Sequence, residues 1–177
     1  VGFTNTPDAW NVTDTGQYPY LQRVCLNIDP SDSDLSKEQT FRDYLTQVPA
    51  GYDSEIRYYR WTAEADFCPV LSRISDILKN RHSISPKNVL YYESDGKETE
   101  PFDIQNLTGF EEMIRNRSGY LTSVTLTCDN GKVKVLTEYN IRLLFGTAVT
   151  QIEYKDGGKA DTLSMLPSAA CVIDRQM

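Results

Sequence analysis

Hydrophobic and polar positions repeat with a helical period in three parts of the chain. In residues 31–48, apolar side chains recur at steps of three and four behind a capping-box pattern. In residues 66–78, six apolar side chains form one stripe behind Asp66, which is a good N-cap. Residues 138–145 carry a shorter pattern of this kind, and Gly146 is expected to close it as a C-terminal cap. These patterns predict up to three helices.

Elsewhere the pattern changes to alternating or continuous β-prone runs, which predict strands. The turn at residues 129–131 lies between two alternating runs and predicts a hairpin. The predicted strands are residues 18–28, 55–65, 89–92, 120–128, 132–137, 151–154 and 169–173. Residues 1–17 are polar and turn-rich, which indicates an irregular lead-in. The sequence therefore predicts an α+β fold, mostly antiparallel sheet, with two to three helices.

Length and composition describe an ordinary globular chain. The sequence has 177 residues, of which 40% are hydrophobic and 24% are charged, so it is expected to fold around a packed core. We expect one domain spanning residues 1–177. The polar stretch after the second predicted helix allows an alternative, two small lobes divided near residues 82–100.

Charge and hydropathy exclude two classes of partner. Eighteen basic and twenty-five acidic residues give a formal net charge of -7, and the basic residues are scattered, so a nucleic-acid groove is not expected. No apolar run approaches the roughly 20 residues that a membrane span needs. The N-terminus has no signal-peptide pattern, so we expect any signal or anchor to lie outside this sequence.

The residues that carry common catalytic and metal chemistry are sparse. His82 is the only histidine, which disfavours a Ser-His-Asp or Cys-His arrangement. The glycine-rich turn at 156–159 lacks P-loop spacing, and the acidic run at 29–34 lacks the glycine and final glutamate of an EF-hand. Carboxylate pairs such as Glu64 with Asp66, or Glu111 with Glu112, are too common among twenty-five acids to predict a hydrolase. We predict no catalytic residue, no metal and no cofactor.

Four cysteines are widely spaced, which argues against a zinc knuckle or a redox motif. They are Cys25, Cys68, Cys128 and Cys171, and all but Cys68 lie in apolar stretches. Buried free thiols and one or two disulfides both remain open.

Residues 58–61 form the densest aromatic run, Tyr58-Tyr59-Arg60-Trp61. Exposed aromatic faces of this kind stack on sugar rings beside polar groups. The alternative is that the rings of one strand alternate between core and surface.

Several short motifs occur in the order found in the SpoIID/LytB family of bacterial cell-wall proteins, and the chain resembles the middle region of that family. The matching elements are Trp10 with Pro19-Tyr20-Leu21, Trp61 before the helix at 67–78, Arg117-Ser118-Gly119 before the strand at 120–128, Asn140-Ile141-Arg142 before Gly146, and Leu166-Pro167-Ser168 before Cys171-Val172-Ile173. The shared order extends over nearly the whole chain.

The resemblance also shows what this sequence lacks. In the family a catalytic glutamate lies upstream in an Ala-Ala-Glu-Met-Pro-like segment, and a Gly-His-Gly-Val-Gly-Met-Ser-Gln-like motif lies downstream. Neither occurs in Val1–Met177. Sporulation members resemble lytic transglycosylases, which cut glycan strands with one acid/base glutamate. The resemblance therefore implies an extracytoplasmic, peptidoglycan-directed accessory region that positions glycan strands, without carrying over the activity.

Two hypotheses of function follow, and a third, that the chain is a complete hydrolase by itself, would need two carboxylates facing each other across a cleft. In the first, Trp10, Trp61, Arg117 and Ser118 line a groove for peptidoglycan glycan strands. In the second, the chain is a non-enzymatic protein-interaction domain that docks envelope or engulfment proteins through an exposed apolar patch. Solvent exposure of Trp61 and Tyr59 is the feature expected to distinguish them.

Overall fold

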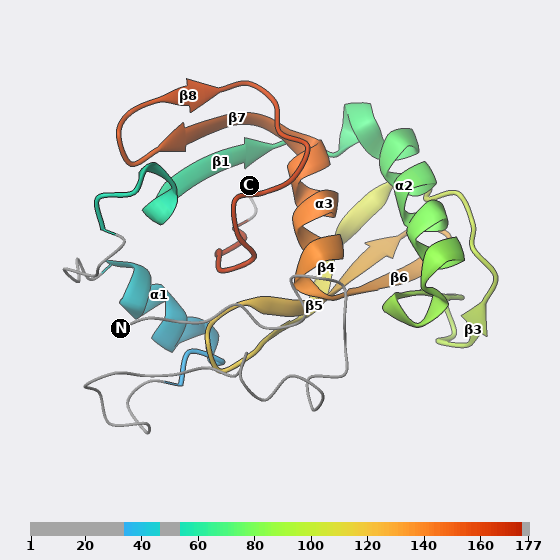
Figure 1. Ribbon diagram of the computed structural model, residues 1–177. Helices are drawn as coiled ribbons and strands as arrows, with labels where there is room; N and C mark the ends of the chain where they lie inside the picture. Colours follow the sequence, from blue (N-terminus) through green and yellow to red (C-terminus); the bar gives the residue numbers. More distant parts are fainter. Residues whose placement is uncertain (1–33, 47–53, 175–177) are drawn as a thin grey trace.

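The computed structural model describes residues 34–46 and 54–174, which form an α+β fold with two antiparallel sheets (Figure 1). The helices are α1 (Glu38–Thr46), α2 (Leu71–Ile84) and α3 (Glu138–Ala148), with the 3-10 turns η4 (Arg57–Tyr59), η5 (Cys68–Val70) and η6 (Pro86–Asn88). The strands are β1 (Trp61–Ala65), β2 (Val89–Tyr92), β3 (Glu98–Thr99), β4 (Leu107–Arg115), β5 (Leu121–Cys128), β6 (Gly131–Leu136), β7 (Val149–Tyr154) and β8 (Lys159–Ala160). The predicted fold class is confirmed.

The larger sheet has five antiparallel strands in the order β3-β2-β6-β5-β4, and α2 and α3 lie against it (Figure 1). The alternating sequence of β6 explains this arrangement, because Val133 and Val135 are fully buried while Lys132 and Lys134, which alternate with them, are only partly buried. The largest fully buried side chains around these elements include Ile74, Leu78, Tyr91, Leu121, Leu126, Ile141 and Leu144.

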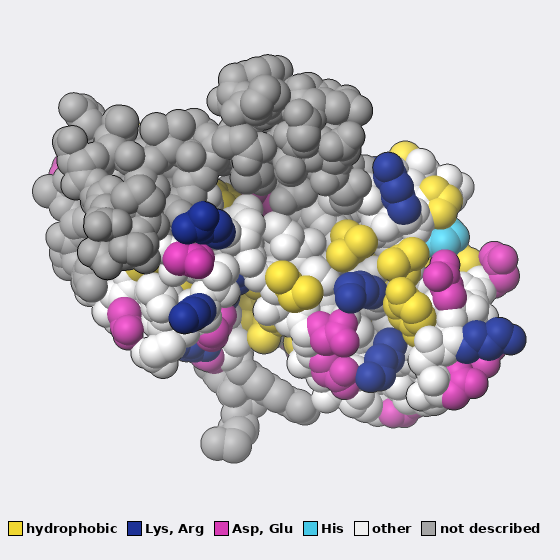
Figure 2. All heavy atoms as spheres, turned by 90° about the horizontal axis from the view of Figure 1, so that it is seen from below, with side chains coloured by type: hydrophobic (Ala, Val, Ile, Leu, Met, Phe, Trp, Pro, Cys, Tyr) yellow, Lys and Arg dark blue, Asp and Glu magenta, His cyan; other side chains and the backbone are white. Residues whose placement is uncertain are grey.

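In β6 the lysines that alternate with the buried valines form ion pairs with glutamates of β4. Lys132 pairs with Glu111 at 3.0 Å, and Lys134 pairs with Glu112 at 3.2 Å, so β6 is joined to β4 across β5. Figure 2 shows one face of the molecule on which basic and acidic side chains lie beside a group of apolar ones.

The smaller sheet has the order β1-β7-β8, and Trp61 at the start of β1 is paired with Tyr154 at the end of β7. The chain leaves β1, builds α2 and the larger sheet, and returns through α3 to β7. Ile152 of β7 and Leu126 of β5 belong to one hydrophobic cluster. The described core is thus continuous across both sheets.

Helix α1 is attached to the β4–β5 hairpin through one aromatic ring and one ion pair. Phe41 is buried, and a Cβ placed on Gly119 of the hairpin would lie 2.5 Å from its ring. Arg115 of β4 lies over the same ring at 4.3 Å and pairs with Glu38 at 2.8 Å. Its guanidinium also donates to the carbonyl of Gly119 at 3.0 Å. Only glycine leaves room for this arrangement at a φ of 88°.

The outer side of α1 contacts two further parts of the chain. Arg42 pairs with Asp174 at 2.7 Å, and this hydrogen bond is the main cause that lowers the pKa of the Asp174 carboxyl. Tyr44 lies 5.6 Å from the guanidinium of Arg60, which directly precedes β1. Helix α1 therefore joins the hairpin, the segment after β8 and the start of β1.

Two predicted helices have different ends in the structure. The second was predicted to end at residue 78, but α2 continues to Ile84 and places His82 in its last turn. The extension is held by a bond from Arg81 to the Asn140 side chain at 2.9 Å. The prediction that Gly146 caps a helix ending at residue 145 is wrong, because Gly146 lies inside α3, which runs to Ala148.

Two predicted strands are also corrected. In the run 55–65, residues 57–59 form η4, closed by a bond from the Tyr59 N–H to the Ile56 carbonyl, and only 61–65 form a strand. Residues 169–173 form no strand, although Ala169 is buried and accepts one backbone bond from Leu121. Their apolar character reflects burial of an irregular segment.

The remaining strand predictions at 89–92, 120–128, 132–137 and 151–154 are confirmed to within a few residues, and so is the hairpin at 129–131. The predicted lead-in at 1–17, the strand at 18–28 and the helix residues before 34 and after 46 lie outside the described residues.

Candidate ligand-binding surface

The four residues predicted to line a groove lie in different places. Trp10 is outside the described residues. Trp61 is half-buried and packs against the core. Arg117 and Ser118 lie in the β4–β5 turn, where the Arg117 side chain is 66% exposed and Ser118 is 4% exposed. Within residues 34–46 and 54–174, Trp61 makes no hydrogen bond, ion pair or ring contact with that turn.

Tyr58 is the exposed member of the predicted aromatic run. It is 57% exposed, whereas Tyr59 and Trp61 are half-buried. Its ring meets Tyr154 of β7 edge to face, with centroids 5.2 Å apart. The exposure of Trp61 and Tyr59 was expected to distinguish the two hypotheses of function, but both side chains are half-buried and favour neither. Tyr58 is the ring that a ligand can reach.

Arg57, beside Tyr58, is fixed on three sides. Its guanidinium lies 4.2 Å from the Tyr154 ring and its Nε lies 3.6 Å from Oδ2 of Asp156. A Cβ on Gly158 would come within 2.6 Å of its Nη2, so the glycine makes room for the planar group. These contacts position the side chain before any ligand arrives. A ligand can still reach it, because 43% of the side chain is exposed.

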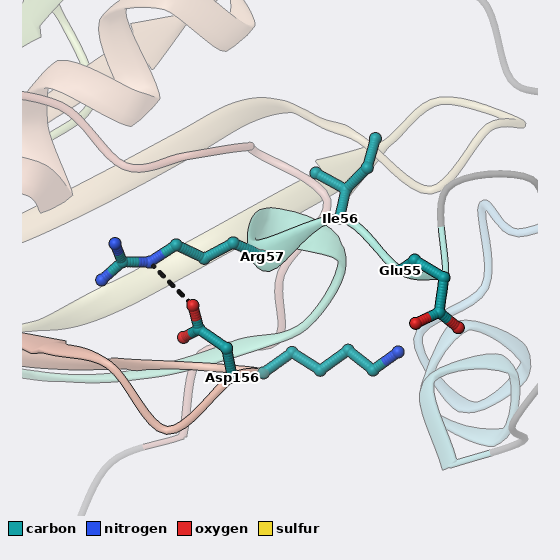
Figure 3. A pocket seen from close by; sticks show the side chains of 5 residues that line it. Glu55, Ile56, Arg57 and Asp156 are labelled. Atoms are coloured by element: carbon teal, nitrogen blue, oxygen red, sulfur yellow. Dashed lines mark ion pairs between the residues drawn. The ribbon is translucent and has the colours of Figure 1, made fainter.

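Arg57 also belongs to a shallow hollow of about 210 Å³, which is lined by Glu55, Ile56, Arg57, Lys155 and Asp156 (Figure 3). We call these five residues together with Tyr58 the η4 surface. The two acids and two bases balance in charge, and Asp156 also accepts the backbone N–H of Gly158 at 2.9 Å. The Lys155 ammonium donates to the Ser54 carbonyl. Such a set offers both donors and acceptors, without a net charge that would select an ion.

A second stack of rings and cations attaches the η4 surface to α1. Arg60 lies 4.3 Å from the Tyr59 ring and 5.6 Å from the Tyr44 ring, and Lys155 lies 5.8 Å from Tyr59. Burial, followed by the nearby Tyr59, raises the pKa of the Tyr44 phenol. These contacts immobilise η4, which is too short to be stable by itself.

Other polar candidates have structural roles. Nδ1 of His82 lies 2.7 Å from the Val89 carbonyl, and its ring meets Tyr91 edge to face. Asp66 accepts the N–H of Cys68 at 3.0 Å. Lys134 lowers the pKa of the Glu112 carboxyl by hydrogen bonding. In the part of the chain that the structure describes, no group of three or more His, Cys, Asp or Glu could hold a metal ion.

The three cysteines among the described residues are free thiols, and they differ in exposure: Cys68 is exposed, Cys128 half-buried and Cys171 buried. Cys25 lies outside the described residues. Burial raises the pKa of the Cys128 thiol to about 11 and that of Cys171 to about 12. Since the thiolate is the reactive form, a thiol reagent at neutral pH should modify Cys68 well before the other two. Peptide mapping after brief alkylation measures the order, and labelling of Cys171 at the rate of Cys68 would contradict the burial.

Comparisons of the chain with protein-family models, with curated proteins and with solved structures found no match. No helix among the described residues is both long enough and apolar enough to cross a membrane.

Sequence reasoning located Tyr58, the one aromatic member of the η4 surface, but missed Lys155 and Asp156. They lie in the β7–β8 turn, far along the chain from Tyr58. Asp156-Gly157-Gly158 predicts only a turn, and the pairing of β1 with β7 is what brings that turn to η4. The one local signal was Gly158, whose missing side chain accommodates Arg57.

Proposed function

We propose that this chain is the accessory, glycan-positioning region of a SpoIID/LytB-like, peptidoglycan-directed protein. The observation that supports it best is the η4 surface, where the exposed Tyr58 directly follows Arg57, one of the residues that line a hollow with two acids and two bases. Sugar sites combine an aromatic platform with polar groups that bind hydroxyls. The described residues supply this combination without a recognisable catalytic set.

The chemistry of the surface suits one pyranose ring of a longer strand. The Tyr58 ring would stack on the apolar face of the sugar, while Glu55 and Asp156 accept hydrogen bonds from hydroxyls and Arg57 donates them. The hollow, at about 210 Å³, is smaller than the roughly 300–1,000 Å³ of pockets that enclose small ligands. An open surface of this size fits a polymer that extends beyond it on both sides.

Replacing Tyr58 by alanine should weaken binding of the chain to insoluble peptidoglycan about tenfold, because one aromatic stacking contact contributes up to roughly 1.5 kcal/mol. Tyr58→Phe should bind nearly as well as the unchanged chain, since it keeps the ring. Co-sedimentation at increasing peptidoglycan concentration measures both affinities.

Ile84→Ala is the matched control, because Ile84 is similarly exposed, at 60%, but lies at the end of α2. Circular dichroism and a thermal melt establish that each variant is folded. The proposal is wrong if the unchanged chain shows no measurable binding. Equal loss in Tyr58→Ala and Ile84→Ala would overturn the assignment of the η4 surface.

A second candidate is docking of a cell-envelope protein, and one observation favours it. Met113 and Ile114 are adjacent on β4 and are 39% and 51% exposed, at the outer strand of the larger sheet. Glu112 before them has a φ of 45° within an irregular part of the strand, a strained conformation that sites of interaction often carry. Absence of peptidoglycan binding would favour this candidate.

A further inference from the structure

The side chain of Asn130, in the turn between β5 and β6, ties that turn to the segment before β4. Its Nδ2 donates to the Asp103 carbonyl at 2.8 Å, and its Oδ1 accepts the N–H of Gln105 at 3.1 Å. The N–H of Asp129 adds a backbone bond to the Gln105 carbonyl at 3.1 Å. A carboxamide is needed at position 130, because a single side chain must supply both a donor and an acceptor.

Position 131 is equally constrained. Gly131 has a φ of 146°, and a Cβ there would lie 2.4 Å from the Tyr92 carbonyl oxygen and 2.9 Å from the Phe102 ring. Any other residue would require the neighbouring strand to move. The fold therefore requires asparagine followed by glycine at this turn, and Asn130 is the only asparagine in the chain that precedes a glycine.

We infer that Asn130 is a site of spontaneous deamidation, and that its contacts with residues 103–105 control the reaction. The Gly131 nitrogen attacks Cγ of Asn130, an N–Cγ bond forms, the Cγ–Nδ2 bond breaks, and ammonia leaves with the proton from the Gly131 nitrogen. Water then opens the cyclic imide to aspartate or isoaspartate. Glycine permits the attack because it has no side chain to hinder its nitrogen.

The native contacts oppose the attack. While its amide is bonded to Asp103 and Gln105, the Asn130 side chain cannot turn back onto the Gly131 nitrogen. Two hydrogen bonds of ordinary strength should slow the reaction about 30-fold relative to the unfolded chain. Modification therefore proceeds chiefly from molecules in which this turn has separated from residues 103–105.

The product cannot restore both contacts, because only the bond accepted from the Gln105 N–H remains possible. A carboxylate at position 130 has no hydrogen to donate and would face the Asp103 carbonyl oxygen. The segment it releases carries Ile104, which is buried and bonds through its N–H to Ser75 of α2 at 3.1 Å. Asp103 itself pairs with Lys79 of α2. Deamidation would thus loosen the attachment of this segment to α2 and to the hairpin.

The rate is tested by incubating the full chain in mildly alkaline buffer, folded or unfolded in urea, and mapping peptides by mass spectrometry. We expect a carboxyl group in place of the amide at Asn130, formed about 30-fold more slowly in the folded chain. The other asparagines serve as internal controls and should change much less. Equal rates in the two states would overturn the inference, as would absence of reaction at Asn130 in the unfolded chain.

The consequence is tested with Asn130→Asp, which places the carboxylate directly. Hydrogen exchange at the amides of Ile104, Gln105 and Asp129 should become at least several-fold faster than in the unchanged chain. Asn80→Asp is the control, since it makes the same chemical change at an exposed position of α2. Exchange at the three amides that matches the control would show that Asn130 does not hold the segment.

Discussion

Replacing Gly146 by alanine will lower the free energy of unfolding by about 3 kcal/mol, the cost of overpacking at a site that cannot relax. A Cβ at this position would lie 2.5 Å from Cα of Met165 and 2.7 Å from the Leu166 nitrogen, and both are backbone atoms. The N–H of Leu166 donates to the Arg142 carbonyl at 3.0 Å, and Arg142 donates back to the Leu166 carbonyl at 2.8 Å. The segment is thus held against the helix where the methyl group would lie.

The expected sign makes this substitution informative. In an unobstructed helix, glycine to alanine stabilises by roughly 1 kcal/mol because alanine has the higher helix propensity. Gly96→Ala is the comparison, because Gly96 has open space around it and a φ of 88°. Its replacement should lower the free energy of unfolding by about 1 kcal/mol through backbone strain alone. Urea denaturation measures all three proteins, and a Gly146→Ala chain as stable as the unchanged one would mean that the Met165 segment is not packed on α3.

Removing the Glu38 carboxylate will destabilise the protein by about 3 kcal/mol, because it leaves the buried Arg115 charge without its partner. The Arg115 side chain is only 2% exposed, and Glu38 accepts hydrogen bonds from both its Nε and its Nη2 at 2.8 Å. Glu38→Ala is the variant, and denaturant unfolding monitored by tryptophan fluorescence measures the loss.

Two comparisons test whether the loss of stability in Glu38→Ala comes from the unpaired buried charge of Arg115 or from a general weakening of α1. Asp174→Asn breaks the ion pair between Arg42 of α1 and Asp174, which is solvent-exposed and should therefore contribute far less. Adding Arg115→Met to Glu38→Ala should recover part of the lost stability, because an apolar side chain leaves no uncompensated charge. If Glu38→Ala costs no more than Asp174→Asn, the Arg115 guanidinium is not desolvated.

Local sequence patterns were sufficient to predict those elements whose structure is determined within one short segment. The alternation of Val133 and Val135 with lysines, next to the Asp129-Asn130-Gly131 turn, specifies the β5–β6 hairpin without reference to the rest of the chain. The apolar stripe of α2 was equally clear. The end of that helix was not, because residues after 78 are held by Asn140, on a different helix.

Gly146 and the η4 surface show where local reasoning fails. A glycine at the end of an apolar helical pattern usually marks a C-terminal cap, but here the glycine admits a neighbouring backbone that no local signal reveals. Tyr58 could be selected from the sequence, while its neighbours Lys155 and Asp156 depend on strand pairing between distant segments. The groove assigned to Trp10, Trp61, Arg117 and Ser118 rests on the resemblance and stays a prediction.

The pairing of β1 with β7 also has a consequence for the order in which the protein is assembled. These strands are separated in the chain by α2, the whole five-stranded sheet and α3, so their association closes a very long loop, whereas the β5–β6 hairpin closes a very short one. Contacts between distant segments form late, after local ones have reduced the entropy that must be lost. Tyr58, Lys155 and Asp156 are brought together by that last closure, so a newly made chain would gain its η4 surface only when folding is nearly complete.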